Sequence, residues 1–134
     1  MGNVCRLAIV LALASVCHPV AAASAGDLWQ VTSTMSMQGM PSAMPARAAS
    51  VCTAKTWSQP PGGVNSSCTR SDFRVDGAKT TWTEKCTNPP MTGHGEITRQ
   101  GDDAFSGAIN FEAPQGNMTI NLDGVRLGDC DSPQ

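Results

Sequence analysis

The densest group of residues with potential chemistry is a set of methionines near the start of the chain. Four of them, Met35, Met37, Met40 and Met44, lie between positions 35 and 44. Thioether sulfurs are soft ligands that select copper(I), so this cluster offers a copper(I) site as one hypothesis. Met35 and Met37 also alternate with polar residues, and methionine at such strand positions commonly just fills a core. We therefore expect no metal and no cofactor, with copper(I) on these four residues as an alternative.

Residues typical of catalysis are scarce. His94 is the only histidine after position 23, and the chain has no tyrosine. A nucleophile needs a base within reach, and no Gly-x-Ser-x-Gly motif is present to position a serine. Asp102 and Asp103 are neighbouring carboxylates in a predicted turn, where solvation accounts for them. We expect that the protein is not an enzyme and has no catalytic residues.

The first 23 residues have the pattern of a secretory signal peptide. Arg6 precedes an uncharged run from Leu7 to Val16, and the small residues Ala21 to Ala23 follow. Cleavage after Ala23 leaves a chain of residues 24–134, which is enough for a single domain. The segment before Cys17 is a poor match to a lipoprotein signal, so we do not expect lipidation. These features predict an exported protein of the periplasm, without a membrane-spanning segment.

The charge of this exported chain argues against some partners. Removing Arg6 leaves 8 basic against 11 acidic residues, a net charge of 8 − 11 = −3. No basic patch or block of like charge is present, which argues against nucleic acid and anionic membranes. We expect a monomer whose partner is a small apolar ligand or another envelope protein.

The cysteines left after cleavage, Cys52, Cys68, Cys86 and Cys130, predict two disulfides, for which three connectivities exist. A domain with so few large apolar residues usually needs such bridges. No two of the four lie close together in sequence, unlike the cysteines of most zinc sites. The preferred pairing is Cys52–Cys68, closing a proline-rich loop, with Cys86–Cys130 holding the C-terminal tail.

The clearest local structure is a hairpin from Ala104 to Leu127. Its two strands place Phe111 opposite Met118, Ile109 opposite Ile120 and Gly107 opposite Leu122, with every apolar side chain on one face. Beyond this hairpin, Gly124 suggests a bulge after which Val125 and Leu127 replace Leu122 on the inner face.

The remaining segments are also predicted to be strands. The expected strands are 27–37, 48–53, 68–76 and 78–87, followed by a strand-like run from Met91 to Ile97. Asp76-Gly77 is a favoured turn that sets Phe73 opposite Trp82. In that register Cys68 faces away from Cys86, so a disulfide between them would need a bulge. A turn at residues 100–102 would set Ile97 opposite Phe105, and the inward glycines Gly93 and Gly95 suggest tight curvature or close approach of a second backbone.

The predicted fold is therefore all-β, an antiparallel meander of about seven strands forming a small disulfide-stapled barrel or sandwich. Such folds often present a cavity or rim, which favours a non-enzymatic binding protein. Two alternatives remain, the copper(I) module and an inhibitor of an exported protease that presents the loop from Ala54 to Ser67.

The order of several short segments along the chain resembles that in the exported bacterial proteins of domain-of-unknown-function family 3617. The matching segments are Asp27 to Thr32, Met35 to Pro41, Val51-Cys52, Cys68, Trp82 to Cys86, Met91 to Ile97 and Arg126 to Cys130. Family members often have Gly-Leu-Trp in place of Asp27-Leu28-Trp29, and a threonine-like residue in place of His94. The resemblance implies an exported protein, carries over no activity, and weakens a catalytic role for His94.

Overall fold

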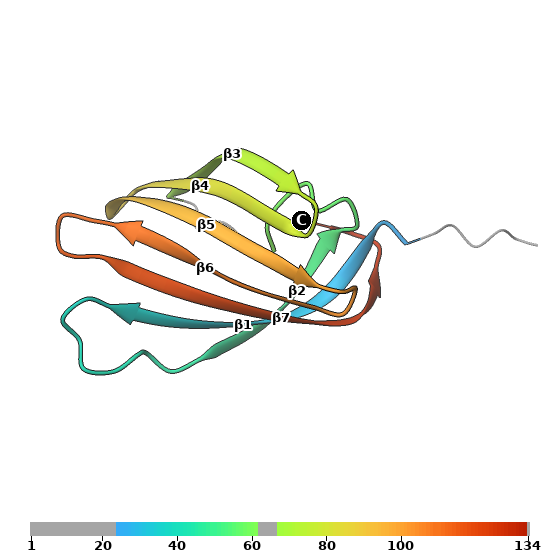
Figure 1. The fold of residues 1–134 in the computed structure, drawn as a ribbon, viewed down its shortest axis with the longest axis horizontal. Coiled ribbons are helices and arrows are strands. Elements are labelled where there is room, and N and C mark those ends of the chain that lie inside the picture. The colour runs from blue at the N-terminus through green and yellow to red at the C-terminus, as the bar shows by residue number, and fades with distance from the viewer. Residues whose placement is uncertain (1–23, 62–66, 134) are drawn as a thin grey trace, which may run out of the picture.

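Figure 1 shows the computed structural model, which describes residues 24–61 and 67–133. The described residues form strands and loops only. The strands are β1 (Gly26–Met37), β2 (Arg47–Ala54), β3 (Cys68–Asp76), β4 (Lys79–Thr87), β5 (Pro90–Gln100), β6 (Ala104–Glu112) and β7 (Met118–Cys130). The predicted signal peptide, residues 1–23, lies outside the described residues.

All seven strands belong to one antiparallel sheet with the order β2-β1-β7-β6-β5-β4-β3. Strands β3 to β7 follow one another as a meander, and the hairpin β1–β2 joins this meander through pairing of β1 with β7. The sheet curls into a half-barrel whose edges are β2 and β3 (Figure 1). The all-β prediction with seven strands is confirmed, and the barrel-or-sandwich alternative resolves to one curled sheet.

The hairpin β6–β7 has the predicted register. Phe111 pairs with Met118, Ile109 with Ile120, and Gly107 with Leu122. Only one side-chain parity puts every apolar side chain of both strands on the inner face, and the turn between Glu112 and Met118 determines which residues of that parity lie opposite each other.

The register predicted between β5 and β6 is wrong by two residues. Ile97 pairs with Gly107 rather than with Phe105, because both strands continue to the pair Gln100 and Ala104. The turn starts one residue later than predicted, at Gly101, whose φ of 68° suits glycine. A two-residue shift keeps the side-chain parity, so the predicted inner face of β5 is unaffected.

The prediction for the end of β7 is also wrong. Val125 and Leu127 remain 57% and 53% exposed, and do not take over from Leu122. Gly124 continues the inner face, and the register shift comes later, where Leu28 pairs with Gly128 and Trp29 with Arg126. The bulge therefore lies at Leu127, and it does not turn Val125 inward.

The preferred disulfide pairing is corrected by the structure, in which Cys68 is bonded to Cys86 and Cys52 to Cys130. The bulge that a bridge across β3–β4 would require is present, since the register shifts between Ser71 and Arg74. The extra residue is accommodated at Asp72, with φ of 54°, and it moves Cys68 to a position directly opposite Cys86.

The disulfide between Cys52 and Cys130 crosses over β1. Cys52 lies on β2 and Cys130 on β7, the two neighbours of β1. Between them lies Gly26, where a Cβ atom would be 3.1 Å from each of the two sulfur atoms. The absence of a side chain at Gly26 leaves room for a bridge that joins the two strands flanking β1.

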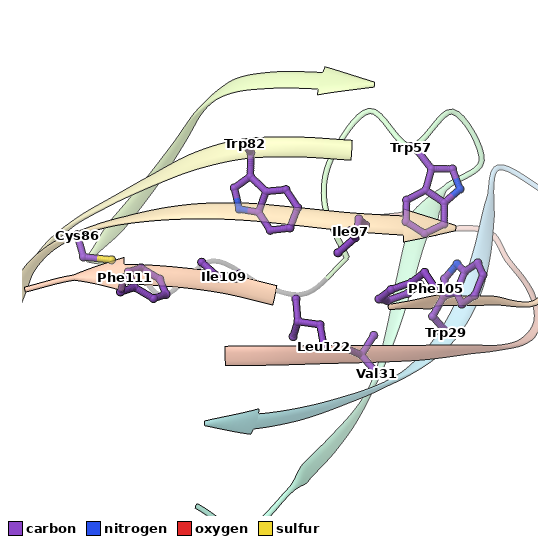
Figure 2. Packing of buried hydrophobic residues seen from close by; sticks show 10 residues of the cluster. All are labelled: Trp29, Val31, Trp57, Trp82, Cys86, Ile97, Phe105, Ile109, Phe111 and Leu122. Atoms are coloured by element: carbon purple, nitrogen blue, oxygen red, sulfur yellow. The ribbon is translucent and has the colours of Figure 1, made fainter. Parts of the chain in front are cut away.

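The core is densest at one end of the half-barrel. There Trp29, Trp57 and Phe105 form a cluster with ring-centroid distances of 5.2 to 5.6 Å (Figure 2). Their edge-on and tilted arrangements are the favourable geometries for aromatic pairs. Cys86 and Phe111 lie toward the opposite end of the same core (Figure 2).

Three inner glycines each lie beneath an aromatic ring of the neighbouring strand. The pairs are Gly93 with Phe111, Gly95 with Trp82, and Gly124 with Phe105, each directly opposite in the sheet. A Cβ atom on these glycines would be 2.5, 2.1 and 2.0 Å from the nearest ring carbon, respectively. A close neighbour was predicted at Gly93 and Gly95 in the form of a second backbone, and the structure places an aromatic ring there instead. Such pairing of a ring with a glycine also helps to fix the register of the sheet.

Candidate ligand-binding cavity

The concave face of the sheet is filled at one end and hollow toward the other. Away from the Trp29–Trp57–Phe105 cluster there is a cavity of about 530 Å³, to which all seven strands contribute residues. Its apolar lining includes Val31, Met35, Ile109, Phe111, Ile120 and Leu122. This volume falls within the usual range for small-molecule sites.

Strand alternation explains how the lining is formed. Successive side chains point to opposite faces of a sheet, so residues two apart share a face. The apolar face of the β6–β7 hairpin forms the floor, through residues such as Ile109 and Ile120. Small side chains on β2, including Ala49 and Val51, leave the space along that edge unfilled.

An ion pair lies in the wall of the cavity on the β3–β4 side. The Nε of Arg70 donates to Glu84 Oε2 at 3.4 Å, and the two side chains are 16% and 7% exposed. The indole Nε1 of Trp82 also donates to Glu84 Oε2, at 3.4 Å. Nη1 of Arg70 donates to the carbonyl of Pro60 at 3.4 Å. Both charged groups are therefore held by neighbouring protein groups.

A second arginine lies on the opposite edge of the half-barrel. Arg47 lines the cavity at the start of β2, sharing its face with Ala49 and Val51. No described residue forms an ion pair with Arg47. The cavity therefore combines apolar walls, one internally neutralised ion pair and one cation at the edge.

The sequence interpretation missed all three charged residues, although a signal was present. Glu84 lies between Trp82 and Cys86 at two-residue spacing, and Arg47 has the same spacing to Ala49 and Val51. A charged residue on the apolar face of a strand needs a partner or a function. Arg70 could not be placed, because the bulge at Asp72 determines which face it occupies.

The predicted methionine cluster divides between the cavity and a loop. Met35 lines the cavity together with Met91 and Met118. Met40 and Met44 are 52% and 43% exposed. Main-chain hydrogen bonds hold their loop against β1, from Met44 N to the carbonyl of Met35 at 2.7 Å and from Met40 N to that of Met37 at 3.2 Å.

Strand alternation favours Met35 and Met37 as core-filling residues, but both are only half-buried. For Met35 the reason is the cavity itself, which leaves the inner face of β1 uncovered.

The loop from Ala54 to Ser67 contributes to the core over its first part. Trp57, Pro60 and Pro61 are buried, whereas Ser58 and Gln59 are exposed. Pro61 also lines the cavity. Residues 62–66 of this loop lie outside the described residues.

The other predicted chemical residues are dispersed. His94 is exposed on β5, where its pairing partners are Thr83 and Asn110. Asp102 and Asp103 are exposed in the turn that joins β5 to β6. Among the described residues, these three side chains do not line the apolar cavity.

The cysteines lie in two separate disulfides and form no four-thiolate site. Cys68, Cys86 and Glu84 place one ligand atom each within 4.8 Å of one another. The two sulfur atoms are bonded to each other, and a metal ligand is a thiolate. This group could therefore hold a metal ion only after reduction of the disulfide.

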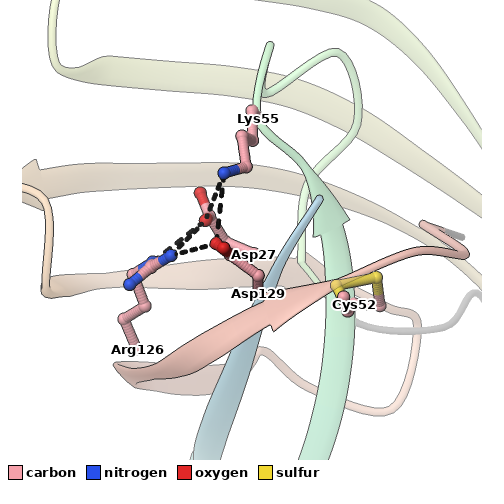
Figure 3. The surroundings of a disulfide bond; sticks show 6 residues. Asp27, Cys52, Lys55, Arg126 and Asp129 are labelled. Atoms are coloured by element: carbon pink, nitrogen blue, oxygen red, sulfur yellow. Dashed lines mark hydrogen bonds and ion pairs between the residues drawn. A yellow bond between two sulfur atoms is a disulfide. The ribbon is translucent and has the colours of Figure 1, made fainter. Parts of the chain in front are cut away.

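A charged network ties the two ends of the domain together beside the Cys52–Cys130 disulfide (Figure 3). Arg126 forms ion pairs with Asp27 and Asp129, and Lys55 Nζ donates to Asp129 Oδ1 at 3.1 Å. The hydrogen bond to Asp27 raises the pKa of Arg126. Hydrogen bonding to Lys55 lowers the pKa of Asp129. This network links β1 and β7 with Lys55, which directly follows β2.

Comparison with known families identifies the group to which this fold belongs. A family described as "Protein of unknown function (DUF3617)" matches residues 25–130. The chain belongs to this family. The match spans all seven strands of the half-barrel, and the resemblance inferred from the motifs is confirmed. The searches of curated proteins and of solved structures found no match.

Two further observations bear on location. The disulfides are compatible with an oxidising, exported location for this member of the DUF3617 family. The part of the chain that the structure describes contains no helix long and apolar enough to cross a membrane.

Proposed function

We propose that this DUF3617 protein is a non-enzymatic protein of the periplasm that binds a small apolar ligand inside its half-barrel. The observation that carries the proposal is the cavity of about 530 Å³, whose walls are mainly apolar and come from every strand of the sheet. If the sequence served stability alone, larger side chains would be expected to fill this space, because an unfilled volume in the core lowers the free energy of unfolding.

The location is inferred from the sequence and from the disulfides. The signal-peptide pattern of residues 1–23 directs the chain out of the cytoplasm, and the two disulfides need an oxidising compartment to form. In a bacterial envelope, a small hollow β domain suits the capture of a poorly soluble molecule.

Calorimetric titration with octan-1-ol tests the binding proposal. We expect saturable binding with one site and a negative heat-capacity change, the mark of apolar burial. Replacing Ile120→Trp or Ala49→Trp should abolish binding, because either indole would occupy the cavity that Ile120 and Ala49 line.

The matched control is Val125→Trp, on the same strand as Ile120 but exposed on the other face. This variant should bind octan-1-ol as the unsubstituted protein does. Absence of saturable binding, or equal binding by the filled variants with their fold intact by circular dichroism, would refute the proposal.

Copper(I) binding is the second candidate, favoured by the main-chain hydrogen bond that returns Met44 to Met35. Replacing Met40 and Met44 with leucine removes two thioethers without changing volume much, so stability should change by less than about 1.5 kcal/mol. Loss of stoichiometric copper(I) binding in this double variant would establish the copper function. The protease-inhibitor hypothesis stays a prediction, and in the described part of its loop Ser58 and Gln59 are exposed whereas Trp57 is buried.

A further inference from the structure

We propose that the ligand is a single-chain amphiphile with an anionic head group, whose tail occupies the cavity and whose head binds Arg47. This inference rests on the proposed function and specifies its ligand class. The groups that carry it are the apolar walls and the cation at the β2 edge, which lie on one continuous surface.

The charges of the lining determine the sign of the head group. Glu84 is the only acidic side chain among the described lining residues, and it is buried and paired with Arg70. Arg70 is in turn committed to Glu84 and to the Pro60 carbonyl. Arg47 is left with a full positive charge facing the cavity and no ionic partner among the described residues. A negative head group is therefore complementary to this site.

The position of Arg47 gives the orientation of the ligand. Arg47 lies at the first residue of β2 and is exposed, whereas Leu122 and Ile109 on the floor are buried. A head group at Arg47 would remain hydrated, and a tail that follows Ala49 toward Ile109 would leave water. This division matches the chemistry of an amphiphile, in which only the tail gains from burial.

A different explanation for Arg47 is protection of an open sheet edge. Inward-pointing charges on edge strands hinder edge-to-edge aggregation, and β2 is an edge strand. Under that explanation Arg47 would affect aggregation but would not discriminate between ligands. The two explanations therefore differ in ligand selectivity, which is measurable.

The test compares octanoate, octyl phosphate, octan-1-ol and octyltrimethylammonium, all with the same tail. We expect both anions to bind about tenfold more tightly than octan-1-ol, the effect of one charge-assisted hydrogen bond. Octyltrimethylammonium should bind more weakly than octan-1-ol. A preference between octanoate and octyl phosphate would identify the head group as carboxylate or phosphate.

The variant Arg47→Gln should lose the anion preference, so that octanoate weakens about tenfold while octan-1-ol changes by less than about twofold. Arg47→Lys should retain part of the preference, because the charge remains. The matched control is Arg74→Gln. Arg74 is exposed on the other edge strand, β3, and lies on the outer face of the sheet. This variant should change the affinity for neither octanoate nor octan-1-ol.

The outcomes separate this inference from the function on which it rests. Equal binding of octanoate and octan-1-ol, or an unchanged preference in Arg47→Gln, would overturn the anionic ligand and leave apolar binding standing. Failure of every ligand to bind would overturn both. A change in aggregation of Arg47→Gln without a change in selectivity would assign Arg47 to edge protection.

Discussion

The ring of Trp82 occupies the space that a side chain on Gly95 would fill, directly across the β4–β5 pair. A Cβ atom at Gly95 would be 2.1 Å from Cε2 of Trp82. Trp82 also donates its Nε1 hydrogen to Glu84, so the ring is fixed both by packing and by a hydrogen bond in the cavity wall. The absence of a side chain at Gly95 thus helps to position the ion pair beside the cavity.

The variant Gly95→Ala should therefore be destabilised by about 1 to 3 kcal/mol, the usual cost of overpacking. In a Trp82→Leu background the same change should cost much less, since no ring remains above residue 95. Urea unfolding of the four proteins in this double-mutant cycle would give the coupling free energy. A cost of Gly95→Ala that is equal in both backgrounds would contradict the packing described.

The disulfide connectivity provides a second prediction. Peptide mapping without reduction should recover Cys52 linked to Cys130 and Cys68 linked to Cys86. The first bridge spans 78 residues and the second 18, so the chain-entropy relation assigns them about 4.5 and 3 kcal/mol. Paired serine substitutions should accordingly lower stability more for Cys52/Cys130 than for Cys68/Cys86. The reverse order, or peptides linking Cys52 to Cys68, would contradict the structure.

Removing one partner of the buried Arg70–Glu84 ion pair should lower the stability of the protein strongly. Replacing both partners with apolar residues should lower it much less. Glu84→Gln removes the carboxylate that pairs with Arg70 in the cavity wall, and breaking a buried ion pair in this way costs about 3 to 5 kcal/mol. The double variant Arg70→Met/Glu84→Leu replaces both charges with apolar groups and should recover most of that loss. Chemical unfolding measures both effects. A double variant as unstable as Glu84→Gln would show that the pair itself is required for the fold.

The network at Asp129 should contribute to the acid sensitivity of the protein. Hydrogen bonding to Lys55 lowers the pKa of Asp129 in the folded state. A lowered folded pKa gives stability that is present above the unfolded value of about 3.9 and is lost as the pH falls below it. The stability difference between the protein and Asp129→Asn should therefore shrink on acidification through this range. Asp131→Asn, which removes no ion pair among the described residues, should show no such trend.

Much of this fold follows from two-residue periodicity in the sequence. The pairs Phe111–Met118 and Ile109–Ile120 could be predicted because alternate residues of both strands are apolar. These apolar side chains all lie on one face of the hairpin only when apolar residues pair with apolar residues. The β5–β6 register failed because Gly101, rather than Gln100, begins the turn. Parity arguments cannot detect such a two-residue shift, since it leaves every side chain on the same face.

The cavity and the disulfides were harder to predict because they depend on bulges and on contacts between distant strands. The bulge at Asp72 brings Cys68 opposite Cys86 and gives no clear sequence signal. The bridge from Cys52 to Cys130 depends on β1 pairing with both β2 and β7, a topology that local patterns do not specify. The spacing of Arg47 and Glu84 in the sequence identifies them as charged residues on the apolar faces of strands. The sequence does not show which residues they face across the cavity.

Methionine methyl resonances offer the most direct test of the central claim that the half-barrel binds an apolar ligand. Met35, Met91 and Met118 line the cavity, whereas Met40 and Met44 lie exposed in the loop after β1. Titration with octan-1-ol should shift the first three methyl signals with a common affinity and leave the signals of Met40 and Met44 in place. Shifts confined to Met40 and Met44, or no saturable shift at any methionine, would contradict ligand binding in the cavity.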